Sequence, residues 1–104
     1  MNIDSVKQIL AGCLTDNAPD EALFQARDIF EVIIAAGKND FKIPTIVLAP
    51  EDYDFVRSLL TENGIDDEVS FYSLLGCADR LMNSDAEANL FQARRLFQIM
   101  LNTL

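Results

Sequence analysis

Two short runs of carboxylates are the densest concentration of reactive side chains in this sequence. Carboxylates at such spacing could bind a divalent cation or exchange protons as an acid–base pair. Both runs, however, stand where a helix is expected to begin, and carboxylates stabilise the first turn of a helix through its dipole. We interpret them as helix-start signals and predict neither a metal site nor a catalytic carboxylate. The residues concerned are Glu51, Asp52, Asp54, Asp66, Asp67 and Glu68.

Histidine is absent, and the 2 cysteines, Cys13 and Cys77, are far apart in the sequence. The absence of histidine removes the usual general base near neutral pH, the Ser-His-Asp triad and His-based metal sites. Two cysteines alone cannot form a structural zinc site, and their apolar neighbours indicate buried, reduced thiols. No phosphate-binding loop or EF-hand spacing occurs. The sequence therefore predicts a protein that is not an enzyme and has no cofactor.

The chain of 104 residues carries 17 acidic and 8 basic residues, for a net charge of -9. A protein that binds nucleic acid directly, or an anionic membrane, normally presents a basic surface. The beginning of the chain lacks the basic and apolar regions of a signal peptide, and no apolar run approaches the roughly 20 residues of a membrane span. We predict a cytoplasmic protein that contacts neither nucleic acid nor membrane directly and binds a protein partner. A basic partner and a homodimer are both open alternatives.

Apolar residues recur at helical spacing in five segments, which the sequence predicts to be helices. Half of the residues are hydrophobic, which is enough for the core of one domain of this length. The expected segments are 4–14, 18–36, a third that begins at Pro50 and ends at Asn63-Gly64, 67–82, and a fifth from Ser84 nearly to the C-terminus.

Capping signals mark the expected ends of these helices. Gly37 is expected to close the second helix in a left-handed conformation, and Ile65 to complete a Schellman motif after Gly64. Pro50 suits the first position of a helix, where its missing N–H costs nothing. The remaining starts are assigned to a capping box at Ser5 and Gln8, to Asn17, to Asp66 or Asp67, and to a capping box at Ser84 and Glu87.

Residues 41–48 have the composition of a strand, with β-branched and aromatic side chains. No partner strand is evident in the sequence, and a lone strand is unstable. We therefore expect an extended connector, or a short helical turn after Pro44. Pairing of this segment across a dimer is the arrangement that would add strands to the fold.

The pentapeptide LFQAR occurs twice, at Leu23 to Arg27 and at Leu90 to Arg94, a separation of 67 positions (90 − 23). The same offset relates Phe30 to Phe97 and several other apolar positions of the two helices. The pattern predicts a duplicated helical hairpin, with the third helix between the two units. Coincidence is the alternative, because amphipathic helices built from good helix formers resemble one another.

A phenylalanine lies in the middle of the polar face of each repeated helix. Phe24 and Phe91 occupy equivalent places on a helical projection, so each ring is either covered by another part of the chain or available to a partner. In the second case the pair would anchor a protein contact. The partner-binding hypothesis therefore comprises Phe24, Arg27, Glu31, Phe91, Arg94 and Gln98.

The most acidic stretch, residues 51–68, gives an alternative binding surface. Its seven acids could dock on a basic partner, or they could simply form a solvated face. In size and charge the chain resembles small acidic proteins that mimic nucleic-acid phosphates, such as anti-restriction and anti-CRISPR inhibitors. This resemblance implies an inhibitor that blocks a nucleic-acid-binding protein through Glu51, Asp52, Asp54, Glu62, Asp66, Asp67 and Glu68.

The sequence thus predicts one all-α domain over residues 1–104, as a small bundle or a short helical-repeat-like stack. Pseudo-repeats over about 4–36 and 67–104 flank a connector and central helix at 37–66. The predicted function is a non-catalytic protein-protein interaction module: an adaptor, a small chaperone or a regulatory subunit. The acidic inhibitor is the alternative.

Overall fold

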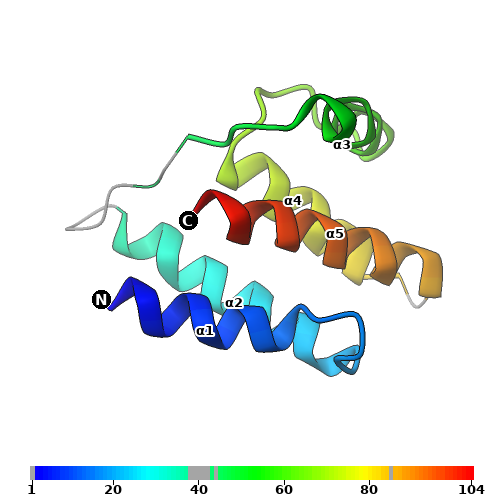
Figure 1. The fold of residues 1–104 in the computed structure, drawn as a ribbon. Helices are drawn as coiled ribbons and strands as arrows, with labels where there is room; N and C mark the ends of the chain where they lie inside the picture. The colour runs from blue at the N-terminus through cyan, green and yellow to red at the C-terminus, as the bar shows by residue number, and fades with distance from the viewer. Residues whose placement is uncertain (1, 38–42, 44, 85) are drawn as a thin grey trace.

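The computed structural model describes residues 2–37, 43, 45–84 and 86–104, and within these ranges it contains five α-helices and no strand (Figure 1). The prediction of an all-α fold is therefore confirmed for the described part of the chain. The helices are α1 (Ile3–Cys13), α2 (Glu21–Ala36), α3 (Pro50–Glu62), α4 (Phe71–Met82) and α5 (Glu87–Thr103).

Four of the helices form a bundle of two antiparallel hairpins, α1 with α2 and α4 with α5. Helix α3 lies across the α4–α5 hairpin, on the side away from α1 and α2. Figure 1 shows α3 end-on where the other four run across the view. The most extensive contact is between α4 and α5, while α2 contacts both of them and α3 contacts α4. The radius of gyration is 12.9 Å, which is the size expected for a compact domain of this length.

Three phenylalanine rings form the centre of the core where the hairpins meet. Phe30 of α2 stacks on Phe97 of α5 with ring centroids 5.4 Å apart, and Phe71 of α4 lies 6.4 Å from Phe30. Offset stacking and tilted contacts are the arrangements that aromatic quadrupoles favour. Phe30 and Phe97 are the two rings that the 67-residue offset relates, so equivalent positions of the two hairpins pack against each other.

The helix bounds follow the same offset. Ala36 ends α2 and Thr103 ends α5, 67 positions later, while their first residues, Glu21 and Glu87, are 66 positions apart. Several equivalent pairs are also fully buried: Leu10 with Cys77, Ala26 with Ala93, and Ile33 with Met100.

The starts of α1 and α2 differ from the prediction, whereas α2 ends at Ala36 as predicted and only the conformation of Gly37 differs. The side chain of Asn2 accepts hydrogen bonds from the N–H groups of Asp4 and Ser5, so Asn2 caps α1 and the predicted Ser5–Gln8 capping box is wrong. The cap predicted at Asn17 is also wrong, because α2 begins at Glu21. Pro19 disfavours helical backbone at the residue before it, and Ala18 N–H instead closes a turn on Thr15 C=O at 3.0 Å. Gly37 has a φ of −62° and not the predicted left-handed conformation.

The starts of α4 and α5 also lie later than predicted. Ser70 and Ser73 form a reciprocal capping box, so α4 begins at Phe71 and the caps predicted at Asp66 or Asp67 are wrong. The serine pair satisfies two backbone donors, which isolated carboxylates earlier in the loop cannot do. Helix α5 has Ala86 as its N-cap and begins at Glu87, so the capping box predicted from Ser84 is wrong. The Ser84 hydroxyl instead accepts from Ala86 N–H at 3.3 Å.

Both ends of α3 confirm the prediction. Pro50 is the first residue of the helix. At the other end Gly64 has a φ of +73°, and its N–H donates to Thr61 C=O at 3.0 Å. The N–H of the buried Ile65 donates to Leu60 C=O at 2.8 Å. These two bonds define a Schellman motif.

The described part of the connector, residue 43 and residues 45–49, has neither helical nor strand structure, which agrees with the extended alternative. Ile46 is buried against the core and Val47 is exposed, so the connector is attached by alternate side chains. Phe41, Lys42 and Pro44 lie outside the described residues.

Candidate functional site

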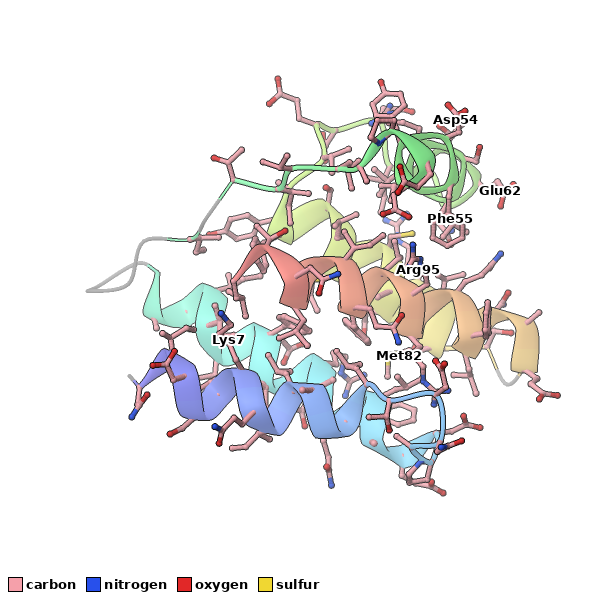
Figure 2. The ribbon with its side chains drawn as sticks, in the orientation of Figure 1. Lys7, Asp54, Phe55, Glu62, Met82 and Arg95 are labelled. Carbon is pink, nitrogen blue, oxygen red and sulfur yellow. The ribbon has the colours of Figure 1, made fainter. Side chains whose placement is uncertain are left out.

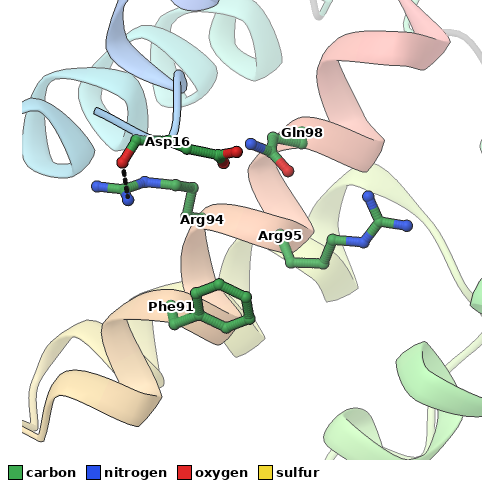
Figure 3. Close-up of a pocket in the computed structure, with 5 residues that line it drawn as sticks. All are labelled: Asp16, Phe91, Arg94, Arg95 and Gln98. Atoms are coloured by element: carbon green, nitrogen blue, oxygen red, sulfur yellow. Dashed lines mark hydrogen bonds between the residues drawn. The ribbon is translucent and has the colours of Figure 1, made fainter. Parts of the chain in front are cut away.

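A cavity of about 460 Å³ lies between α5 and the loop that joins α1 to α2 (Figure 3). This volume falls in the range of small-molecule and side-chain pockets. We call it the Phe91 cavity, and its lining residues are Asp16, Phe91, Arg94, Arg95 and Gln98. Three of these five belong to the partner-binding residues predicted from the sequence.

One face of α5 positions this lining, because residues three to four positions apart project on the same side of a helix. Arg94 donates to Ala18 C=O at 2.9 Å and to Asp16 C=O at 3.5 Å. Gln98 donates through Nε2 to Leu14 C=O at 2.8 Å. Both side chains thereby satisfy carbonyls at the end of α1 and in the loop after it, which would otherwise lack partners. Arg94 and Gln98 therefore build the wall of the cavity and fix the loop.

The ring of Phe91 is the most exposed of the phenylalanine rings that the structure describes, at 68%. Figure 3 shows the ring at one side of the cavity, with Arg95 on the other side. Arg95 itself forms an ion pair with Asp52 of α3. The guanidinium charge of Arg95 is therefore largely compensated from within the chain, and Phe91 remains without cover from any described residue close enough to stack on it.

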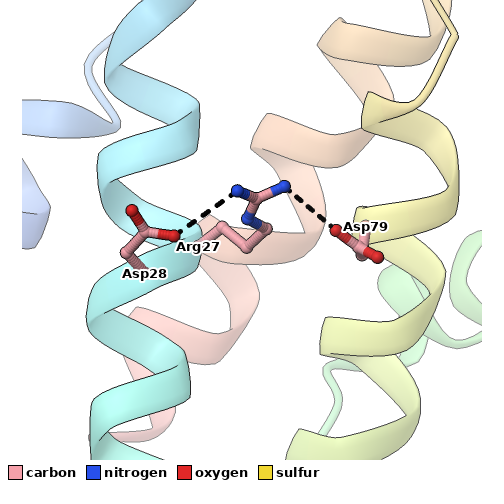
Figure 4. Close-up of polar contacts among 3 residues, drawn as sticks. All are labelled: Arg27, Asp28 and Asp79. Atoms are coloured by element: carbon pink, nitrogen blue, oxygen red, sulfur yellow. Dashed lines mark hydrogen bonds and ion pairs between the residues drawn. The ribbon is translucent and has the colours of Figure 1, made fainter.

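The equivalent ring on α2 has different surroundings. Phe24 is 41% exposed, and the guanidinium of Arg27 lies over it at 5.3 Å from the ring centroid. Arg27 also donates to Asp79 of α4 at 3.2 Å and contacts Asp28 at 3.5 Å (Figure 4). We call this group, Phe24 with Arg27, Asp28 and Asp79, the Phe24 cluster. The cluster joins α2 to α4, and its cation, Arg27, already contacts the ring and two carboxylates of the same chain.

The six predicted partner-binding residues thus fall into two groups. Phe91, Arg94 and Gln98 line one cavity, and Phe24 and Arg27 belong to the Phe24 cluster, with Glu31 exposed one turn further along α2. The sequence did not indicate Asp16 or Arg95. Asp16 lies in a loop, and Arg95 was not among the predicted partner-binding residues, so both were found only from the contacts between distant segments.

The acidic residues predicted as a docking surface lie on α3 and in the loop after it. Figure 2 shows Asp54 and Glu62 pointing away from the body of the protein. Of these seven acidic residues, only Asp52 forms an ion pair with a described residue. The other six are exposed and form no ion pair there; they are Glu51, Asp54, Glu62, Asp66, Asp67 and Glu68. We call these six the acidic face.

Both cysteine thiols are free and buried. Burial raises the pKa of the Cys77 thiol from 9.0 to about 11, with a lowering contribution from Arg80 and a raising one from Glu62. The thiol donates to Leu59 C=O at 3.6 Å. A thiol held neutral in this way is a poor nucleophile at neutral pH. No group of three or more Cys, Asp or Glu side chains in the described ranges is placed to hold a metal ion.

Comparison with known proteins gives no match to a protein-family model, to a curated protein or to a solved structure. None of the helices in the described ranges is long and apolar enough to cross a membrane.

Proposed function

We propose that this protein is a non-catalytic protein-protein interaction module, an adaptor or regulatory subunit, that binds a basic partner through the face around Phe91. The observation that carries the proposal is the exposed ring of Phe91 beside a cavity whose other walls are held in place by hydrogen bonds. An aromatic anchor on a rigid rim is the typical centre of a protein interface. The net charge of -9 favours a partner of opposite charge.

The neighbouring residues have supporting roles in this proposal. Arg27 keeps α2 and α4 in place, and Arg94 keeps the α1–α2 loop in place. The free, buried thiols of Cys13 and Cys77 fit a reducing compartment such as the cytoplasm.

The test is site-specific photo-crosslinking in the source cell. A photoreactive phenylalanine analogue is placed at position 91, with position 53 as a matched control because Tyr53 is another exposed ring, 54% accessible, on α3. We expect one basic protein to crosslink at position 91 and not at position 53. The Phe91→Ser variant should lose that protein in a reciprocal capture while its melting temperature stays unchanged.

Two results would contradict the proposal. Equal crosslinking of the basic protein at positions 91 and 53 would mean that the Phe91 face has no special role. Crosslinks at position 91 to this chain alone would identify the partner as a second copy, which is the homodimer alternative.

A second candidate function is an acidic inhibitor that occupies the nucleic-acid site of its partner. The acidic face supports it, because six exposed carboxylates without ion pairs in the described ranges leave a strong negative potential. In this candidate the protein would compete with phosphates for a basic groove, and its binding would weaken steeply as salt screens the charges.

Charge reversal separates the second candidate from the first. Replacing Asp54, Glu62, Asp66 and Asp67 by lysine changes the net charge from -9 to -1 (−9 + 8). Asp52 is left intact because it holds Arg95. A matched control reverses four exposed acids elsewhere: Asp4, Glu21, Glu31 and Glu87.

An acidic inhibitor should lose its block of DNA binding by the captured partner in the first variant and keep it in the control. Equal effects of the two variants would show that only the net charge matters. Inhibition that survives reversal of the acidic face would contradict the second candidate.

A further inference from the structure

The two hairpins treat equivalent phenylalanine rings differently. In the Phe24 cluster the guanidinium of Arg27 lies over the ring, so the chain itself supplies a cation to the aromatic face. At the 67-residue offset the corresponding residues are Phe91 and Arg94. Arg94, however, turns to the α1–α2 loop and donates to Ala18 C=O. No described cation lies over the Phe91 ring, and its face is left open to solvent.

The Phe91 cavity also offers hydrogen-bond acceptors. Gln98 uses its Nε2 group as a donor to Leu14 C=O, so its side-chain oxygen points the other way and accepts a hydrogen bond from none of the described residues. Figure 3 shows this oxygen directed into the space between Gln98 and Arg95. Asp16 is an exposed residue of the lining, and Figure 3 shows its carboxylate on the Gln98 side of the cavity. The site therefore combines an open aromatic face, a carboxylate and an amide oxygen.

A planar cation with several N–H donors fits this combination. The face of an aromatic ring attracts a cation, and guanidinium groups stack on such faces more often than ammonium groups do. The five N–H donors of a guanidinium can reach two acceptors at once. Arg94 and Arg95 also line the cavity, but Arg94 pairs with Asp20 at 3.8 Å and Arg95 pairs with Asp52. Among the described residues, Asp16 is therefore the one charged group of the lining without an ion pair.

We infer that the Phe91 cavity binds an arginine side chain of the partner protein, which stacks on Phe91 and donates to Asp16 and Gln98. The incoming guanidinium takes the place that Arg27 occupies over Phe24 in the other hairpin. This inference rests on the proposed function, and it specifies the chemistry of the partner at the contact.

The test uses the full chain and three capped tripeptides in which the central residue is varied. The probe is N-acetyl-Gly-Arg-Gly-amide, and the controls contain citrulline or glutamate in place of arginine. Citrulline keeps the planar shape and removes the charge. Binding is followed by the amide chemical shifts of the ¹⁵N-labelled protein. A single side chain should bind weakly, with a dissociation constant on the order of millimolar.

We expect the arginine peptide to shift the amides of residues 15–17 and 91–98 in a saturable way, and the citrulline peptide to cause no saturable shift. Phe91→Leu should weaken arginine binding roughly five- to tenfold through loss of the aromatic face. Asp16→Asn should weaken it by a smaller factor, about threefold. Phe24→Leu is the matched control and should leave the affinity unchanged, because Arg27 already covers that ring.

Several outcomes would overturn the inference: equal binding of the citrulline peptide, stronger binding of the glutamate peptide, shifts confined to α3 and residues 66–68, or no saturable shift. Its failure is distinct from failure of the proposed function. If the peptide fails but partner capture still depends on Phe91, the binding function stands without the arginine. If the peptide binds in the cavity but no partner crosslinks at position 91, the cavity binds arginine and the proposed partner-binding function is wrong.

Discussion

Phe24 and Phe91 belong to two copies of the same pentapeptide, but their surroundings in the fold differ. In the Phe24 cluster the arginine of the motif lies over the ring and reaches a carboxylate on α4. In the Phe91 cavity the arginine reaches backbone carbonyls of the α1–α2 loop, and the ring stays open. Each arginine side chain turns toward the strong acceptors within its reach, and the segment packed beside it, α4 or the α1–α2 loop, supplies them. The same local sequence therefore gives a structural link in one hairpin and an open surface in the other.

The shared core is where the two hairpins should behave alike, and it carries the largest expected effect. Phe30→Ala and Phe97→Ala each remove a fully buried ring from the stacked pair. We expect each variant to lose about 3–5 kcal/mol of unfolding free energy, measured by urea denaturation. A loss below about 1 kcal/mol for either variant would show that one hairpin alone sustains the core.

A titratable group distinguishes the buried positions Leu10 and Cys77, which the 67-residue offset relates. Folding raises the pKa of Cys77 from 9.0 to about 11. Between these two pH values the native state therefore binds more protons than the unfolded state. The thiol's contribution to stability is full below pH 9 and is lost as the pH rises through about 11. Relative to Cys77→Ala, the wild type should lose roughly 2–3 kcal/mol over this range.

The measurement is urea denaturation of both proteins at several values between pH 8 and pH 11. Other groups that titrate in this range affect both proteins equally, so the difference between their curves isolates the thiol. Parallel pH curves for the two proteins would show that the Cys77 thiol does not titrate differently on folding.

The two arginines of the repeated motif should differ in their structural importance. The Arg94 side chain is 13% exposed, bonds to loop carbonyls and pairs with the exposed Asp20 at 3.8 Å, whereas Arg27 is 25% exposed and pairs with a half-exposed Asp79. Arg94→Met should cost about 1–3 kcal/mol, because it leaves carbonyls without their charged donor. Arg27→Met should cost less than about 1 kcal/mol, as for other exposed ion pairs. If urea denaturation gave the same loss of unfolding free energy for Arg94→Met and Arg27→Met, the two arginines would not differ in structural importance.

The smallest effects are expected at the two surface rings. Phe91→Ser should change the unfolding free energy by less than about 0.5 kcal/mol, because its ring packs on little else. Phe24→Ser should cost about 0.5–1 kcal/mol through loss of the contact with Arg27. Thermal melting compares the two variants directly. A large fall in the melting temperature of Phe91→Ser would mean that the ring belongs to the core and is not a contact surface.

Several features of the fold could be predicted because they depend on neighbours in the sequence. Helical spacing of apolar residues gave the five helices, and Pro50 and Gly64 gave both ends of α3. The other predicted caps were wrong where two candidates competed. Ser70, paired with Ser73, displaced the aspartates before it, and Pro19 delayed α2 past Asn17. Cap preferences alone do not rank such competitors, because a reciprocal capping box or a nearby proline can override them.

The candidate site was predictable only in part. The position of Phe91 on a polar helix face identified it from the sequence, and Arg94 and Gln98 followed from helical spacing. The part played by Asp16 could not be found in this way, because it depends on how the α1–α2 loop lies against α5. The sequence also could not show that the charge of Arg95 is compensated, because its partner Asp52 lies on α3, 43 positions away.

The sequence by itself determined the helical class, the acidic surface and the two equivalent phenylalanine positions, because periodicity, composition and repetition are local properties of the chain. Only the tertiary structure decided which phenylalanine is left open. That choice depends on whether the acceptors within reach of an arginine belong to α4, as Asp79 does for Arg27, or to the α1–α2 loop, as Ala18 C=O and Asp20 do for Arg94. Packing of the two hairpins brings those acceptors into place.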